Sequence, residues 1–284
     1  MRIAAALVAA LVTCAVQVAD GFPAILERTS AYVAKFEEEF ASIIWHETYE
    51  QIDRLPRTFG ASGGRFAGVT RRHLESEMLF ILAESDGAWL TVRDVISVDG
   101  KPVPRRLPTL LASPDVWIRD LRALSQENGR YNIGAIYRNF NEPTLALSFL
   151  DSRYRRRFRF TDGGPGEIDG SPLRRIRFAE VVTPTVIRNE NRNLRASGNL
   201  IVEPATGRVL RTELTLLLDK GNDKNSVRAE LTVAYRPDAR LGLLVPVEMH
   251  ESYGFGSAGP DQRIECTATY ADFRRFETSG RVIQ

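Results

Sequence analysis

The stretch that decides the fold runs from Gly198 to Phe276 and opens with GNLIVEPATGRVLRTELTLLL at residues 198–218. Apolar, strand-forming residues fill both ends of this segment, and a turn at Glu203–Gly207 with proline and glycine separates them. Proline and glycine end regular structure because each has unusual backbone preferences. The segment therefore predicts two neighbouring strands joined by the turn.

The next part of this stretch repeats the same pattern. In Val227–Tyr235, VRAELTVAY, every second residue is apolar, which predicts a strand that buries one face. We expect two more strands at Leu244–Tyr253 and Arg263–Phe276, with turns between all of them. Such an antiparallel meander has one dry face, which other parts of the chain must cover.

Composition describes an ordinary globular protein. The chain has 284 residues, of which 43% are hydrophobic and 26% charged, and its formal charge is +2. A nucleic-acid-binding protein usually carries a larger positive excess, so we expect no nucleic acid partner. The cysteines are Cys14 and Cys266. We predict that Cys266 is buried in a strand and forms no intramolecular disulfide, because Cys14 lies in a segment that we expect to be removed.

The first 21 residues resemble a signal peptide. Met1-Arg2 is positive, Ile3–Val18 is apolar, and Ala19-Asp20-Gly21 offers small residues for cleavage. We therefore expect an exported, periplasmic protein whose mature chain starts near Phe22 and has no integral membrane span. Lipoprotein processing at Cys14 is the alternative, although Thr13 replaces the small residue that such sites prefer.

The N-terminal half mixes a helix with strands. Apolar residues at helical spacing predict an amphipathic helix over Pro23–Ile43, and a change of period predicts a strand from Trp45. The glycine-rich segment Arg54–Arg72 is predicted to be a mobile loop. Leu74–Ala83 and Ala88–Val98 are predicted to form a hairpin, because an Asp-Gly pair lies between them.

The middle of the chain is harder to assign. Ser113–Asn128 begins with a serine cap and a proline, which predicts a helix. We expect a short apolar helix at Glu142–Leu150, buried or shielding a cavity. Tyr154–Phe160 is predicted to alternate as a strand, Gly163–Gly166 to form a turn, and Leu173–Val182 to be a strand.

No motif in the chain specifies a catalytic site. His46-Glu47-Thr48-Tyr49-Glu50 begins like a zinc-protease helix, but Glu50 replaces the second histidine and the segment is predicted to be a strand. The other histidines, His73 and His250, have no recognisable context, and no Gly-x-Ser-x-Gly is present. We predict neither a metal site nor a cofactor. A hydrolase that uses His46, Glu47 or His250 is the least favoured hypothesis.

A basic cluster lies shortly before Gly163–Gly166. Arg155, Arg157 and Arg159 share one face of the predicted strand, and Arg174–Arg177 lies in a predicted neighbouring strand. Arginine on a solvated strand face discourages unwanted edge pairing. The same groups also suit anionic lipid head groups or an acidic partner protein. The sequence leaves both interpretations open.

The C-terminal half resembles the outer-membrane lipoprotein carrier and sorting group, which has the LolA-like fold. The resemblance lies in the strand Gly198–Val202, the turn Glu203–Gly207, the following Arg208–Arg211, the segment Leu244–Val247 and the closing Ala268–Phe273. It implies an α+β fold, in which a curved antiparallel sheet forms an incomplete barrel and helices cover the concave face that holds acyl chains. The whole chain also resembles a family of uncharacterised exported bacterial proteins.

These observations favour one domain over residues 22–284, with a helix and hairpin part at 22–150 and the meander at 151–284. We predict non-catalytic binding of a lipid or other apolar ligand between sheet and helices. A non-catalytic interaction module of an envelope complex is the alternative. The predicted ligand contacts are Phe36, Phe40, Leu214, Leu216, Val233 and Tyr235, and the predicted anionic contacts are Arg155, Arg157 and Arg159.

Overall fold

The computed structural model describes residues 21–41, 43–54, 56–59, 64–83, 88–112, 115–134, 138, 140–189, 192–218, 227–255, 263–275 and 281–283. The predicted signal peptide lies outside this range, apart from Gly21. Its interpretation therefore stays a prediction.

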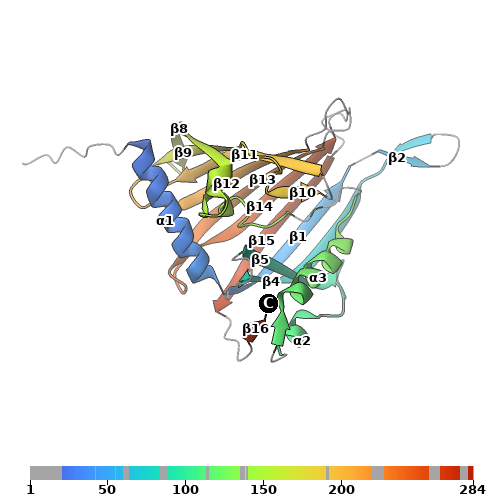
Figure 1. The fold of residues 1–284 in the computed structure, drawn as a ribbon. Coiled ribbons are helices and arrows are strands. Elements are labelled where there is room, and N and C mark those ends of the chain that lie inside the picture. Colours follow the sequence, from blue (N-terminus) through green and yellow to red (C-terminus); the bar gives the residue numbers. More distant parts are fainter. Residues whose placement is uncertain are drawn as a thin grey trace, which may run out of the picture.

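Among the described residues, one antiparallel sheet of 12 strands forms the body of the protein (Figure 1). The strands are β1 (Ile43–Asp53), β4 (Thr70–Ala83), β5 (Ala88–Val98), β6 (Lys101–Pro102), β8 (Phe158–Ile168), β9 (Ser171–Glu180), β10 (Ile187–Asn189), β11 (Arg192–Val202), β12 (Val209–Leu218), β13 (Val227–Asp238), β14 (Leu243–Phe255) and β15 (Arg263–Arg275). Their order is β6-β5-β4-β1-β15-β14-β13-β12-β11-β9-β8, with β10 paired to β11. The sheet does not close, which confirms the predicted α+β fold and incomplete barrel.

Strand alternation sets the two faces of the sheet. On β1, Trp45, Glu47, Tyr49 and Gln51 are all buried on what we call the inner face. His46, Thr48 and Glu50 point to the outer face, because successive residues of a strand point in opposite directions. β1 pairs with β15 on one side and β4 on the other, so the strands of the N-terminal and C-terminal parts lie in the same sheet.

Helix α1 (Phe22–Phe40) covers one end of the inner face, as Figure 1 shows. Proline lies in its first turn, where the missing N–H leaves no intrahelical bond unmade. Val33, Phe36 and Phe40 are buried, and the Phe40 ring lies 5.1 Å from that of Trp45 and 5.5 Å from that of Phe80. The helix ends three residues earlier than predicted, because Ile43 already pairs in β1.

The turn after β11 packs against α1. Gly207 has φ +76°, and a Cβ there would lie 2.5 Å from the Arg28 carbonyl, so only glycine fits this close approach. The Arg28 Nε donates to the Pro204 carbonyl oxygen at 3.0 Å. The predicted turn Glu203–Gly207 is therefore also a docking site for the helix.

Two further helices lie at the other end of the sheet, on its outer face. They are α2 (Leu107–Leu111) and α3 (Ile118–Asn128), and their leucines pack with Ile44, Leu79 and Val92. The helices therefore cover parts of both faces, rather than the concave face alone. The predicted start of α3 was wrong, because Asp115–Trp117 forms β7, which pairs with β16 (Arg281–Ile283).

Three local predictions also need correction. The predicted loop Arg54–Arg72 contains two paired strands, β2 (Pro56–Phe59) and β3 (Gly64–Ala67). The expected strand over Tyr154–Phe160 begins only at Phe158, after the short helical turn η3 (Arg155–Arg157). Gly163–Gly166 continues β8 with a shift of register, and Gly163 gives the Arg175 backbone room to approach.

The predicted short helix at Glu142–Leu150 is a series of turns that ends in η2 (Ser148–Leu150), and η1 (Gly129–Tyr131) follows α3. Phe149 and Leu150 are buried on the inner face. This apolar segment fills the space beside α1, as its composition predicted.

Candidate ligand-binding site

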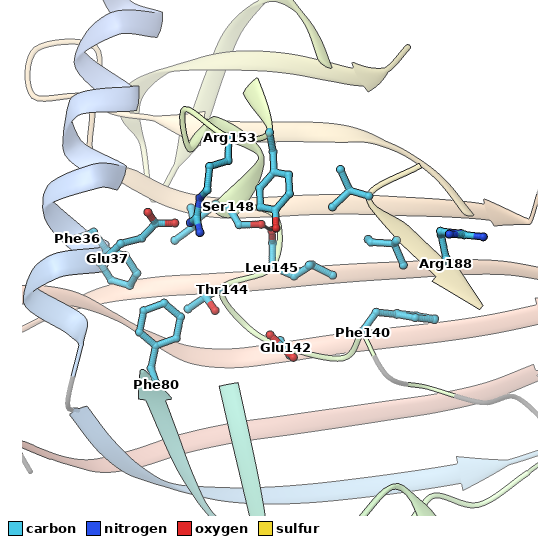
Figure 2. Close-up of a pocket in the computed structure, with 14 residues that line it drawn as sticks. Phe36, Glu37, Phe80, Phe140, Glu142, Thr144, Leu145, Ser148, Arg153 and Arg188 are labelled. Atoms are coloured by element: carbon cyan, nitrogen blue, oxygen red, sulfur yellow. Dashed lines mark hydrogen bonds between the residues drawn. The ribbon is translucent and has the colours of Figure 1, made fainter. Parts of the chain in front are cut away.

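A pocket of about 350 Å³ lies on the inner face between α1, residues 140–154 and β10 (Figure 2). We call it the amphipathic pocket, because apolar and charged side chains line it together. The apolar part includes Phe36, Phe80, Phe140, Leu145, Leu147 and Val186, and the charged part consists of Glu37, Glu142, Arg153 and Arg188. Its volume lies within the range of small-molecule sites, which is roughly 300–1,000 Å³.

The wall formed by residues 143–154 is held in place from the sheet. The ring of Phe149 stacks on that of Phe158 at 4.4 Å and meets Phe178 edge-on at 5.5 Å. From the other side, the Tyr235 hydroxyl donates to the Pro143 carbonyl oxygen. These contacts fix a segment without regular secondary structure, so the pocket has a defined wall.

An ion pair borders the pocket next to α1. Arg153 donates from Nε to Asp151 Oδ1 at 2.7 Å and from Nη2 to Oδ2 at 2.9 Å. Burial alone would raise the pKa of Asp151, but the hydrogen bonds from Arg153 outweigh burial and lower it. Figure 2 shows Glu37 and Arg153 pointing toward each other from opposite walls. Asp151 therefore stays ionised beside the pocket at neutral pH.

Glu142 lies on the opposite side of the pocket and has a different environment. Burial raises the pKa of its carboxyl to about 7, against the opposing effects of the Thr91 hydroxyl and the Arg93 charge. A carboxyl with this pKa is partly protonated at neutral pH. The pocket therefore contains one group whose charge changes in the physiological range.

A network of buried polar side chains adjoins the pocket on the inner face of β1, β5, β14 and β15. Arg93 binds the buried carboxylate of Glu47 through two hydrogen bonds of 2.6 and 2.9 Å. The Tyr49 hydroxyl donates to Glu251 Oε2 at 3.2 Å, and the Tyr253 hydroxyl donates to the same oxygen. Burial raises the pKa of Glu251. These groups bind one another, although Glu251 Oε1 is buried without a hydrogen-bond partner among the described residues.

Sequence reasoning missed this network. Its only signal is that Glu47, Tyr49 and Gln51 share a parity with Trp45 on β1, which places polar residues on the buried face. The local pattern predicts a strand here, and Glu47 enters it only through the zinc-protease-like motif and the hydrolase hypothesis. The partner of Glu47 is Arg93, 46 residues away in the sequence, and only the strand pairing brings the two together.

The six predicted ligand contacts are all buried on the inner face: Phe36, Phe40, Leu214, Leu216, Val233 and Tyr235. Phe36 lines the amphipathic pocket. Phe40 stacks on Phe36 at 4.9 Å, and Tyr235 holds Pro143. Leu214, Leu216 and Val233 belong to the packed core of the sheet. A ligand-binding role for these residues stays a prediction.

Phe36 also borders a second hollow, of about 610 Å³, on the other side of α1. This hollow lies between the helix and the turns that follow β11 and β13, with Tyr32, Pro237 and Leu243 in its lining. α1 therefore separates two hollows, and Phe36 is common to both.

The predicted anionic contacts are partly occupied within the protein. Arg155 pairs with Glu27 at 2.5 Å. Arg157 donates to the Pro184 carbonyl oxygen and lies 3.7 Å from Glu180. Arg159 is exposed on β8. The structure does not gather these residues around a described pocket, so their contact with an anionic partner stays a prediction.

The three histidines lie on the outer face of the sheet. His46 and Thr48 contact Glu75, and His73 bridges Glu50 at 2.5 Å and Glu75 at 2.6 Å. The hydrogen bond that the His73 ring donates to Glu50 is the main cause that raises the pKa of His73. Within the described residues, no group of three or more His, Cys, Asp or Glu side chains is arranged to hold a metal ion.

Cys266 is buried on β15, as predicted, and is a free thiol. Its surroundings are more polar than expected, because Arg138 Nη1 lies 2.8 Å from the sulfur. Burial still raises the pKa of the thiol to about 12. Cys266 is therefore protonated at neutral pH and is a weak nucleophile.

Comparisons with known proteins give structural similarity only. No family model matches the chain, and no curated protein matches it. A domain from Vibrio parahaemolyticus, classed as an outer membrane lipoprotein-sorting protein, is 12% identical, with a TM-score of 0.42, over 90% of this chain and 95% of that one. A DUF1329 family protein from Desulfovibrio piger is 11% identical, with a TM-score of 0.38, over 88% of this chain and 92% of that one.

The Vibrio domain is of the lipoprotein-sorting kind that the turn and strand motifs of this sequence resemble. In the described part of the chain, no helix is both long enough and apolar enough to cross a membrane.

Proposed function

We propose that this protein binds a lipid or another amphipathic ligand in the amphipathic pocket, without catalysing a reaction. The observation that carries the proposal is the pocket itself, which joins aromatic and aliphatic walls to a few charged groups. Apolar walls favour a hydrocarbon chain by removing it from water, and a small number of polar groups fix its orientation.

The absence of catalysis is part of the proposal and rests on the position of the reactive groups. His46, His73 and His250 point to the outer face of the sheet, and their described contacts are with glutamates or Thr267. On the inner face, Arg93 occupies the Glu47 carboxylate, and the Cys266 thiol is protonated. None of these groups combines exposure to the amphipathic pocket with an activated nucleophile.

We also propose that residues 22–284 form one domain that works in the periplasm after export. The signal-peptide pattern of residues 1–21 supports export, and the pairing of β1 with β15 supports a single folding unit. A periplasmic site of action suits a lipid ligand, since the ligand would be taken from or delivered to a membrane surface.

The first test is native mass spectrometry of the exported protein, purified without detergent and then extracted with organic solvent. We expect a bound lipid in stoichiometric amount. Val186→Trp fills the pocket from its wall and should remove the lipid, because Val186 lines it. Val181→Trp is the matched control, since Val181 is 47% exposed on the surface nearby.

Protein that carries no lipid, with the mass of the mature chain alone, would contradict the proposal. Retention of the lipid by Val186→Trp would show that any ligand lies elsewhere. In that case the larger hollow beside Tyr32 and Leu243 is the next region to block.

A further inference from the structure

A smaller pocket, of about 190 Å³, lies between α3, the inner side of β5 and residues 128–142. We call it the polar pocket, because Arg93, Asn128, Arg138, Asn141 and Glu142 are among its lining residues. Glu142 lines the amphipathic pocket as well. The two pockets therefore lie on either side of the same residue.

Arg138 is the buried cation of the polar pocket. Its Nη1 donates to the Tyr49 hydroxyl at 3.2 Å and to the Cys266 sulfur at 2.8 Å. Its Nη2 donates to Gln51 Oε1 at 2.6 Å and to the Ile133 carbonyl oxygen at 3.0 Å. All four acceptors are uncharged. Its Nε has no hydrogen-bond partner among the described residues, although the side chain is only 3% exposed.

The neighbouring guanidinium groups differ from Arg138 in this respect. Arg93 binds the Glu47 carboxylate, and Arg153 binds the Asp151 carboxylate. Glu251 approaches Arg138 but uses Oε2 to accept from Tyr49 and Tyr253. Of Arg93, Arg138 and Arg153, Arg138 alone has no direct carboxylate partner in the described part of the chain. The charge of Glu251 acts on Arg138 without a hydrogen bond between them, so a bound anion would give this buried cation a direct charged partner.

We propose that the polar pocket binds the carboxylate of a long-chain carboxylic acid at Arg138, while the hydrocarbon chain occupies the amphipathic pocket. This inference rests on the proposed function and names the ligand class. Both Nη atoms of Arg138 already donate to protein acceptors, so the Nε–H is the donor left for a carboxylate oxygen, in a charge-assisted hydrogen bond. Asn128 and Asn141 line the same pocket. Each Nδ2 donates one hydrogen within the protein, to the Arg93 carbonyl oxygen and to the Tyr49 hydroxyl, and has a second hydrogen to offer an anion.

The test compares palmitate with methyl palmitate, which has the same chain and no charge. We titrate the delipidated full-length mature protein with each compound. The dissociation constant for palmitate should be about tenfold lower than that for methyl palmitate, since a hydrogen bond to a charged group contributes that much. Arg138→Gln should abolish this preference, so that the acid and the ester bind with about equal affinity. Arg153→Gln should keep a clear preference, because Asp151 already occupies that guanidinium.

Each outcome separates the inference from the proposed function. Equal affinity of the wild-type protein for acid and ester overturns the inference but leaves lipid binding intact. Binding of neither compound contradicts both. Loss of the preference in Arg153→Gln alone would place the anion in the amphipathic pocket. Binding of acetate as tight as that of palmitate would indicate a site for free carboxylates without a chain.

Arg138 is buried, and its replacement risks misfolding, so a second variant keeps the inference testable. Glu142→Gln removes the carboxyl group at the junction of the two pockets and should raise the ratio of palmitate to ester affinity at pH 8. An unchanged or lower ratio in this variant would contradict the placement of the anion beside Glu142.

Discussion

The inner face of the sheet consists of two regions that bury different chemistry. Over β11, β12 and β13 it carries aliphatic side chains such as Leu200, Leu214 and Leu216. Over β1, β5 and β14 it carries Glu47, Arg93 and Glu251. Glu47 and Glu251 are as buried as the leucines, and Arg93 binds Glu47. The same strand alternation buries both sets.

The difference between these regions lies in what each side chain requires of its neighbours. An aliphatic side chain needs only apolar contact and a suitable volume, so other side chains of similar size can replace it. A buried carboxylate needs a particular donor at a particular distance. The apolar region therefore contributes stability in a tolerant way, whereas the polar region specifies one arrangement. The candidate pockets lie where the polar region meets α1 and residues 140–154.

The largest effect is expected when a buried ion pair loses one member. Arg93→Met leaves the Glu47 carboxylate buried without its partner and should lower the free energy of unfolding by about 3–5 kcal/mol. The double variant Glu47→Leu/Arg93→Met should be close to wild type, because neither charge is then buried. Urea denaturation measures both. A double variant as unstable as the single one would show that the pair itself is stabilising.

In the aliphatic region, Leu216→Ala should cost about 2–5 kcal/mol, because it leaves a cavity in the core. Leu217→Ala is the matched control, since Leu217 is the next residue along β12 and points outward with 42% exposure. The control should change the free energy of unfolding by less than about 0.5 kcal/mol. Equal losses in both variants would contradict the assignment of the inner face.

Glu142, in the pocket wall beside the polar region, makes the stability of the protein depend on pH. Its pKa is about 7 in the folded protein and near 4.5 when unfolded, so the folded state binds more protons between these values. Stability should therefore fall as pH rises from about 4.5 to about 7, by about 1–3 kcal/mol, and then level off. Glu142→Gln should remove this contribution, which is read as the difference between the two unfolding curves. Identical pH profiles would show that Glu142 titrates normally.

The smallest effect is expected at the surface. Arg155 and Glu27 are 2.5 Å apart, but the Glu27 side chain is 68% exposed and solvent screens the pair. Arg155→Met should therefore change the free energy of unfolding by less than about 1 kcal/mol. A loss as large as that of Arg93→Met would mean that burial does not explain the strength of the ion pairs.

Sequence pattern was a reliable guide to the apolar region and a poor one to the polar region. The strands β12 to β15 begin and end within three residues of their predicted bounds, because alternation and turn residues are local signals. β11 begins at Arg192, six residues before the predicted start at Gly198. Leu216 and Val233 are buried as their parity indicated. Whether they contact a ligand is a question of cavity shape, which alternation does not report.

The polar region depends on contacts between distant parts of the chain. Glu47 and Arg93 meet across β4, and Arg138 reaches Gln51 from a segment 87 residues away. Neither distance nor register can be read from the local pattern around His46–Glu50. The same limit applies to the pocket wall, because residues 143–154 have no regular period and are positioned by Phe158, Phe178 and Tyr235.

The contact between Gly207 and Arg28 has a consequence for the order of folding. α1 comes early in the chain, but the turn on which it rests lies 176 residues after Arg28. Phe40 at the end of the helix can pack on Trp45 and Phe80, which follow soon in the sequence. The contacts of Arg28 with the turn wait for the β11–β12 hairpin, and contacts of such long range form slowly. The Arg28 end of α1 is therefore expected to take its final position later in folding than the Phe40 end.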